Sequence, residues 1–175
     1  MLIIFRTDAS TKIGTGHVER CLTLAEGFRD QGSECRFICR DHDGHLVDRI
    51  RSCAFPVHIL SGGLVSSSVE LPGQYSGWLG VDWRVDLVQT CQVIGDRKPC
   101  WIIVDHYALD YRWESGLRAY CKKIMVIDDL ADRYHECDLL LDQNYGSTDA
   151  RYGGLVPEYC EHCHGPKYAL IKSHF

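Results

Sequence analysis

The segment LIIFRTDASTKIGTGHVERCLTLAEGFRDQG, residues 2–32, decides the fold class of this 175-residue chain. It begins with a short apolar run, continues through a polar loop with two glycines, and ends in HVERCLTLAEGFRDQG (17–32), where apolar residues recur at helical spacing. Gly32 is suited to end the helix, because glycine readily adopts the left-handed conformation of a C-terminal cap. ECRFICR (34–40) is predicted to be the next strand, which completes one strand, helix, strand unit.

Strands and helices alternate along the rest of the chain. Helices are predicted over 44–55, 83–96 and 109–121, and strands over 56–60, 100–105, 122–129 and 137–144. Asp82 is placed to cap the second of these helices, and the glycine-rich and serine-rich segment 61–77 is predicted to be a mobile loop. This order predicts an α/β fold: a Rossmann-like, open, mostly parallel sheet with helices on both faces.

The composition is that of a globular domain with a sizeable core, since 45% of the residues are hydrophobic and 25% are charged. A net charge of −5, without basic runs interleaved with aromatic residues, argues against a nucleic-acid partner. Apolar runs are too short for a membrane span or a signal-peptide core. We therefore expect a cytoplasmic protein whose ten scattered cysteines are reduced thiols.

Acidic residues follow several of the predicted strands, namely Asp8, Asp105, Asp128, Asp129 and Asp142. In doubly wound sheets the ligand binds outside the carboxyl ends of the strands, so the group is predicted to surround a ligand site. Any single member has a structural alternative, because aspartate commonly caps helices and braces loops.

Gly14 and Gly16 stand where the first loop becomes a helix, directly before His17. Glycines allow a ligand to approach the backbone, and the N-terminus of a helix favours an anion or a polarised sugar. IGTGH lacks the third glycine of the dinucleotide fingerprint, and the chain has no GK[ST] phosphate loop. No cofactor, neither NAD nor ATP, is predicted.

His17 is the candidate general base. The helix N-terminus disfavours the imidazolium, and a neutral ring can accept a proton from water. Asp8 or another loop group is expected to hydrogen-bond the second ring nitrogen and orient the ring. The alternative interpretation is that His17 only packs against the loop at the start of the helix.

FRTDASTKIGTGHVERCLTLAEGFRDQG (5–32) resembles the opening of the UDP-2,4-diacetamido-2,4,6-trideoxy-β-L-altropyranose hydrolases of pseudaminic acid biosynthesis, in which R-x-D-x-S/T leads into I-G-x-G-H. Further matching pieces follow in the family's order: WLGVDWRVDL, IIVDHYALD, VIDDLADRYHECDLLLDQN, RYGGLVPEYC and GPKYALIKSHF. The resemblance implies one half of a glycosyltransferase type B-like fold. Residues 1–170 would form its N-terminal domain, and 171–175 would begin the junction to a C-terminal nucleotide-binding domain that this chain lacks.

The resemblance also implies the chemistry. His17 is the catalytic residue of the family pattern, which activates a water molecule to attack the anomeric carbon of a UDP-sugar and releases UDP without a metal. Asp8, Tyr107 and Asp129 match substrate-binding positions that face the cleft, alongside Gly14 and Gly16.

Lys172 also matches a substrate-binding position, but the family more often has arginine there, and His174 replaces the usual acid. Lysine keeps the charge of arginine but loses the planar fork that binds phosphate through two hydrogen bonds. A contact between Lys172 and the diphosphate is therefore expected to be weaker than one made by arginine.

Three alternatives to the hydrolase remain open. The chain is also compatible with half of a glycosyltransferase or of a sugar-nucleotide epimerase, and with a domain that only binds a partner when isolated. A third alternative is zinc binding by YCEHCHG, which supplies Cys160, His162, Cys163 and His164 with C-x2-C spacing. The second half of a conventional pair of zinc knuckles is missing, so no metal site is predicted.

Overall fold

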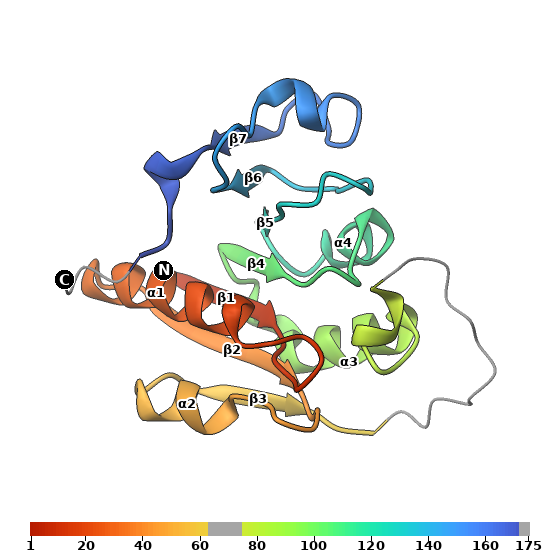
Figure 1. Ribbon diagram of the computed structural model, residues 1–175. Coiled ribbons are helices and arrows are strands. Elements are labelled where there is room, and N and C mark those ends of the chain that lie inside the picture. The colour runs from red at the N-terminus through yellow and green to blue at the C-terminus, as the bar shows by residue number, and fades with distance from the viewer. Residues whose placement is uncertain (63–74, 172–175) are drawn as a thin grey trace.

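The computed structural model describes residues 1–62 and 75–171. These residues form one sheet of seven parallel strands in the order β3-β2-β1-β4-β5-β6-β7 (Figure 1). The strands are β1 (Leu2–Thr7), β2 (Glu34–Arg40), β3 (Val57–Leu60), β4 (Trp101–Asp105), β5 (Lys123–Ile127), β6 (Leu139–Asp142) and β7 (Glu161–His164). The predicted Rossmann-like α/β fold is confirmed.

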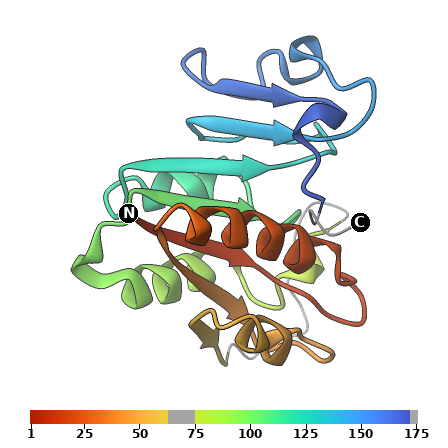
Figure 2. The same ribbon diagram turned by 90° about the vertical axis from the view of Figure 1, so that its left-hand side faces the viewer.

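Four α-helices flank the sheet. They are α1 (Gly16–Asp30), α2 (Val47–Ser52), α3 (Trp83–Ile94) and α4 (Tyr111–Leu117), with short 3-10 helices η1 (Ser76–Trp78), η2 (Gly95–Arg97), η3 (Asp149–Tyr152) and η4 (Pro166–Tyr168). Helices α1 and α2 cover one face, with α1 lying across the front of the sheet in Figure 2, and α3 and α4 cover the other face. The predicted helices exist, but α2 and α4 are shorter than expected.

The core consists of two apolar layers, one on each face of the sheet. On the α1 side, Phe5 stacks on Phe37 with ring centroids 4.8 Å apart, and Leu22 of α1 packs into the same layer. On the opposite side, Ile102 of β4 and Trp113 of α4 are completely buried. Because successive side chains of a strand point to opposite faces, strands covered on both faces are apolar at nearly every residue.

The cap at Asp82 and the stop at Gly32 are those that the sequence predicts, and Asp110 is a further cap. Asp82 caps α3 by accepting a hydrogen bond from the backbone N–H of Arg84 at 2.8 Å, and Asp110 caps α4 in the same way. Gly32 follows α1 with a φ of 79°, a conformation that glycine adopts without strain. These caps fix where the loops begin at the edge of the sheet.

The sheet differs from the prediction beyond β5. Strand β7 was not predicted, because its residues EHCH at the edge of the sheet show no apolar alternation. The connections 128–138 and 143–160, which the structure describes throughout, contain no α-helix. Of the predicted loop 61–77, residues 63–74 lie outside the described residues.

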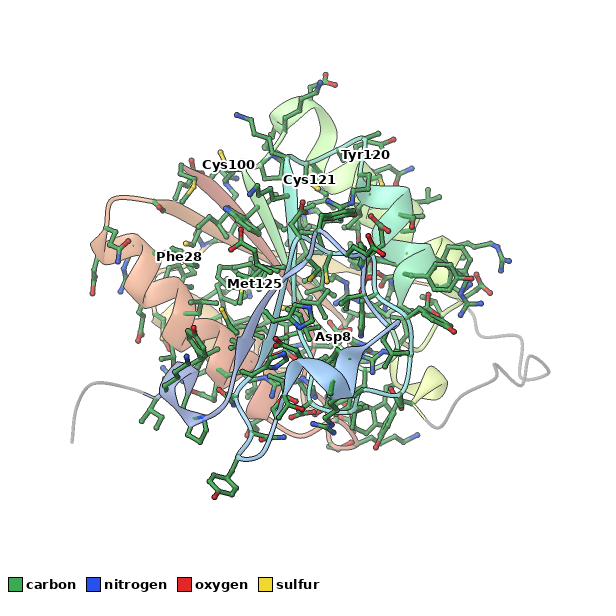
Figure 3. The ribbon with its side chains drawn as sticks, turned by 90° about the horizontal axis from the view of Figure 1, so that it is seen from above. Asp8, Phe28, Cys100, Tyr120, Cys121 and Met125 are labelled. Carbon is green, nitrogen blue, oxygen red and sulfur yellow. The ribbon has the colours of Figure 1, made fainter. Side chains whose placement is uncertain are left out.

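All ten cysteines lie among the described residues and are free thiols, as the sequence suggests. Cys100 and Cys121, which precede β4 and β5, lie at the end of the sheet opposite to Asp8 (Figure 3). Within residues 1–62 and 75–171, no helix combines the length and the hydropathy that crossing a membrane requires.

A buried network of charges joins β1 and β2 to α3. Asp86 of α3 accepts hydrogen bonds from Arg6 of β1 at 2.6 Å and from Arg40 of β2 at 2.7 Å, and all three side chains are buried. The indole N–H of Trp113 also donates to Asp86, at 3.1 Å. Burial alone would raise the pKa of Asp86, but the charge of Arg6 lowers it. The network therefore holds an ionised carboxylate inside the protein.

We predict that Arg6→Leu lowers the free energy of unfolding by about 3–5 kcal/mol, because it leaves two buried carboxylates, Asp8 and Asp86, without their shared partner. The matched control is Arg36→Leu, which removes an exposed pair with Glu34 and should change stability by less than about 1 kcal/mol. Urea unfolding measures both values. Equal losses in the two variants would contradict the assignment of the network as a structural anchor.

Candidate active site

The carboxyl ends of β1 and β4 place His17 beside a buried carboxylate. The two strands are neighbours and pair in parallel, with Thr7 opposite Asp105, and the order of strands reverses between them. His17, in the first turn of α1, reaches over this edge, and its Nδ1 lies 2.6 Å from Oδ1 of Asp105. The ionised carboxylate of Asp105 can only accept a hydrogen bond. In the neutral ring of His17, Nδ1 therefore carries the proton, and Nε2 keeps its lone pair.

Arg20 completes the pairing of Asp105. Its Nε donates to Oδ2 at 2.5 Å and its Nη2 to Oδ1 at 2.6 Å, a two-bond fork on the carboxylate. Nη2 also lies 3.2 Å from Nδ1 of His17, because both donors share the same acceptor oxygen. Burial would raise the pKa of Asp105, but the hydrogen bonds from Arg20 and its positive charge lower the pKa to about 2. Asp105 therefore stays ionised at neutral pH.

Aromatic side chains form a wall around the His17 ring. Tyr107 meets it edge to face with centroids 4.5 Å apart, and Trp78 does so at 6.4 Å. Trp78 and Tyr107 are stacked with centroids 5.7 Å apart, and Tyr75 contacts both rings. Such a wall offers apolar faces next to a base, a combination typical of sites for small ligands.

Asp129 links the wall to Arg20. The hydroxyl of Tyr107 donates to Oδ1 of Asp129 at 2.5 Å, and Nη1 of Arg20 lies 3.4 Å from Oδ2. Burial and the bond to Asp129 both raise the pKa of Tyr107, so its hydroxyl remains a donor at neutral pH. Tyr107 and Asp129, both selected from the sequence, thus lie with His17 in one hydrogen-bonded group.

Asp8 lies in the interior beneath this group and does not orient His17. Its side chain is 0% exposed and accepts from Arg6 at 2.6 Å and from the backbone N–H of Arg40 at 2.6 Å. Its second oxygen lies 3.1 Å from Nε2 of His106. The expectation that Asp8 or another loop group orients His17 is corrected: the partner is Asp105 at the end of β4, because the oxygens of Asp8 are engaged by Arg6, Arg40 and His106.

The other residues selected from the sequence are spread around the same edge. Gly14 has a φ of 82° and closes a turn by donating its N–H to the carbonyl of Ser10 at 2.9 Å. Gly16 begins α1, and an added Cβ would meet no atom within 4 Å at Gly14 or at Gly16. Both glycines therefore leave open space beside the helix N-terminus. Lys172 lies outside the described residues.

Three residues of the site, Arg20, Tyr75 and Trp78, were not selected from the sequence. Arg20 stands three residues after His17, a spacing that puts both side chains on one face of a helix, so this signal was present. Trp78 directly follows the predicted loop 61–77, where the sequence has no periodic pattern, and only the folded chain brings its ring to His17.

Comparison with known proteins agrees with the resemblance seen in the motifs. The chain is 32% identical over 176 residues to UDP-2,4-diacetamido-2,4,6-trideoxy-β-L-altropyranose hydrolase of Campylobacter jejuni subsp. jejuni serotype O:2. This similarity covers 100% of the chain and 53% of the relative, so the chain spans about half the length of the curated relative it matches. No protein-family model matches the chain. The resemblance to these hydrolases is confirmed.

We predict that the free energy of unfolding of Asp105→Asn depends less on pH than that of the wild type. The pKa of Asp105 falls from its ordinary value of 3.8 to about 2 on folding. The ionised carboxylate thus contributes about 2 kcal/mol to the free energy of unfolding above pH ~4. This contribution is lost as the pH falls through ~2. Urea unfolding between pH 7 and pH 2 should show a smaller decline for the variant, from a lower starting value. The exposed Asp48→Asn is the control, and parallel profiles of wild type and Asp105→Asn would contradict the pairing.

Proposed function

We propose that this chain is the histidine-bearing half of a hydrolase that releases UDP from a UDP-linked 2,4-diacetamido-2,4,6-trideoxy sugar, as the name of its Campylobacter relative states for that protein. The single observation that carries the proposal is the 2.6 Å contact between Nδ1 of His17 and the buried Asp105. It leaves Nε2 as a free base beside an aromatic wall. A carboxylate that orients a histidine in this way is the arrangement of general-base catalysis.

In the proposed mechanism, Nε2 of His17 accepts a proton from a water molecule while the water oxygen attacks the anomeric carbon. The bond between that carbon and the oxygen of the diphosphate breaks, and UDP leaves with the bonding electrons as an anion. Asp105 stabilises the imidazolium that forms, and the proton then returns to solvent. The reaction consumes one water molecule and yields UDP and the free sugar.

Arg20 has a positioning role in this mechanism. It occupies both oxygens of Asp105, so the carboxylate cannot rotate away from His17. Its own charge also keeps Asp105 ionised, because ionised carboxylates pair strongly with a guanidinium fork. Asp8, which is buried beneath the site, supports the strand edge and is not proposed to touch the substrate.

The aromatic wall and the start of α1 suggest how the substrate lies. Trp78 and Tyr107 offer apolar ring faces for the sugar, and Asp129 can accept hydrogen bonds from its polar groups. The backbone at Gly14 and Gly16 is open beside the positive end of the helix, which favours the diphosphate. We propose that a C-terminal domain, such as the relative's additional length would supply, provides the remaining contacts to UDP and takes part as a partner of this chain.

We predict that a chimera releases UDP when this chain replaces the matching 53% of the Campylobacter hydrolase. The substrate is the UDP-diacetamido-altrose nucleotide without any acceptor. His17→Ala in the chimera should lower kcat by a hundredfold or more, the usual contribution of a positioned base. The fold should persist, because Arg20 still compensates Asp105. Coupled UDP detection measures the rate.

The control is His58→Ala, which changes an exposed histidine on β3, away from the site. An unchanged rate in His17→Ala would exclude His17 as the base. A chimera that folds and binds UDP but releases it only when a sugar acceptor is added would favour a transferase instead.

We predict that Trp78→Ala in the same chimera raises KM by up to about tenfold and leaves kcat within about threefold, because the ring contributes contact area and not proton transfer. Steady-state kinetics separate the two constants. A large fall in kcat with KM unchanged would place Trp78 in the chemical step instead of in binding.

A further inference from the structure

Three ligand-type atoms from β7 and η3 converge on one point. They are Nδ1 of His162, Nε2 of His164 and Oδ1 of Asp149. The two imidazole nitrogens are 2.9 Å apart, and Oδ1 of Asp149 lies 3.1 Å from the nitrogen of His164 and 3.8 Å from that of His162. His162 and His164 alternate with Cys163 along the strand, so both rings point to the same face.

A chain of hydrogen bonds fixes the tautomer of His164. The hydroxyl of Ser147 donates to the buried Asp142 at 2.7 Å, so its oxygen is free to accept from Nδ1–H of His164 at 3.0 Å. The proton on Nδ1 leaves a lone pair on Nε2, the atom that faces His162 and Asp149. Tyr152 stacks on the His164 ring with centroids 5.5 Å apart and limits its rotation.

A cation at the point of convergence would be bound by all three atoms. A lone pair of His164 and a carboxylate oxygen of Asp149 face each other at 3.1 Å, and two acceptors at that distance repel unless a proton or a metal ion lies between them.

We propose that His162, His164 and Asp149 form a binding site for a divalent transition-metal ion, with Zn²⁺ as the expected occupant. Zinc bonds of about 2.05 Å at tetrahedral angles put neighbouring donor atoms about 3.3 Å apart, and the three observed separations lie on both sides of this value. Two imidazoles and a carboxylate suit metals of this class, and a water molecule completes the set. Ser147 and Asp142 supply the outer hydrogen bonds that orient metal-binding histidines.

The site differs from the zinc alternative considered in the sequence, because the cysteines of YCEHCHG do not take part. Cys163 points to the α1 face of the sheet, and Cys160 lies 3.6 Å from Cys137 in the opposite apolar layer. The histidines instead pair with Asp149, which precedes them by more than ten residues. The loop fold, and not the C-x2-C spacing, creates the ligand set.

The site is separate from the proposed base. Strand β7 lies three positions from β4 in the sheet, about 14 Å at the usual spacing of strands. A metal ion here would tie the edge strand to η3 and stabilise a part of the sheet that no α-helix connects. Its role is therefore structural.

The test is a titration of the whole chain with Co²⁺ and then Zn²⁺, under reducing conditions. We expect one Co²⁺ per chain with visible d–d bands, no thiolate charge-transfer band, and displacement by Zn²⁺. Asp149→Asn changes a side chain that is 82% exposed, so it should fold normally and bind at least about tenfold more weakly. His162→Gln should do the same, and His58→Gln, at the opposite edge of the sheet, should bind as the wild type does.

A second readout is thermal stability. Zn²⁺ should raise Tm by a few degrees in the wild type and in His58→Gln but not in Asp149→Asn, since a ligand that binds only the folded state stabilises it. The proposal is overturned if the wild type binds no Co²⁺, if Asp149→Asn and His162→Gln bind with wild-type affinity, or if an intense thiolate band shows that cysteines hold the ion.

Discussion

Four fully buried carboxylates at the carboxyl edge of the sheet each require a cation, and each has an arginine as its partner. The acids are Asp8, Asp105, Asp128 and Asp142, and their partners are Arg6, Arg20, Arg133 and Arg151. An ionised carboxylate without a partner is strongly destabilising in a protein interior. The pairs of Arg20, Arg133 and Arg151 therefore hold α1, the connection 128–138 and η3 against the ends of strands.

Asp105 is the member of this series that supports chemistry. Its strand lies next to β1 at the reversal of strand order, the place where doubly wound sheets bind their ligands. Its partners Arg20 and His17 come from the first turns of α1, and His17 keeps one ring nitrogen free. Asp8, by contrast, is enclosed by its own strand and by β2, and so serves the framework.

Asp142, at the end of β6 and next to the edge strand β7, also accepts several hydrogen bonds. It accepts from Arg151 at 2.7 Å and from Tyr152 at 3.1 Å, and so holds η3 beside β7. The same carboxylate accepts from Ser147, which sets the ring of His164. A buried acid at the end of a strand that gathers several donors thus prepares both the proposed base and the proposed metal site.

The sequence by itself determined the order of the periodic elements and, at Asp82 and Gly32, two of their limits. The alternation of apolar strands with helices, the cap at Asp82 and the left-handed Gly32 are local properties, so they are visible without the fold. The sequence also predicted that acids follow the strands and that His17 begins a helix. It supplied no signal for β7, whose four residues carry no apolar pattern.

Only the tertiary structure decided which acid holds which partner. His17 and Asp105 are 88 residues apart in sequence, and they meet because β4 pairs with β1. Asp8 is only nine residues from His17, yet it turns inward to Arg6. Contacts between neighbouring strands follow the order of the sheet, which arises from the packing of all helices and strands together. No local pattern of residues encodes that order.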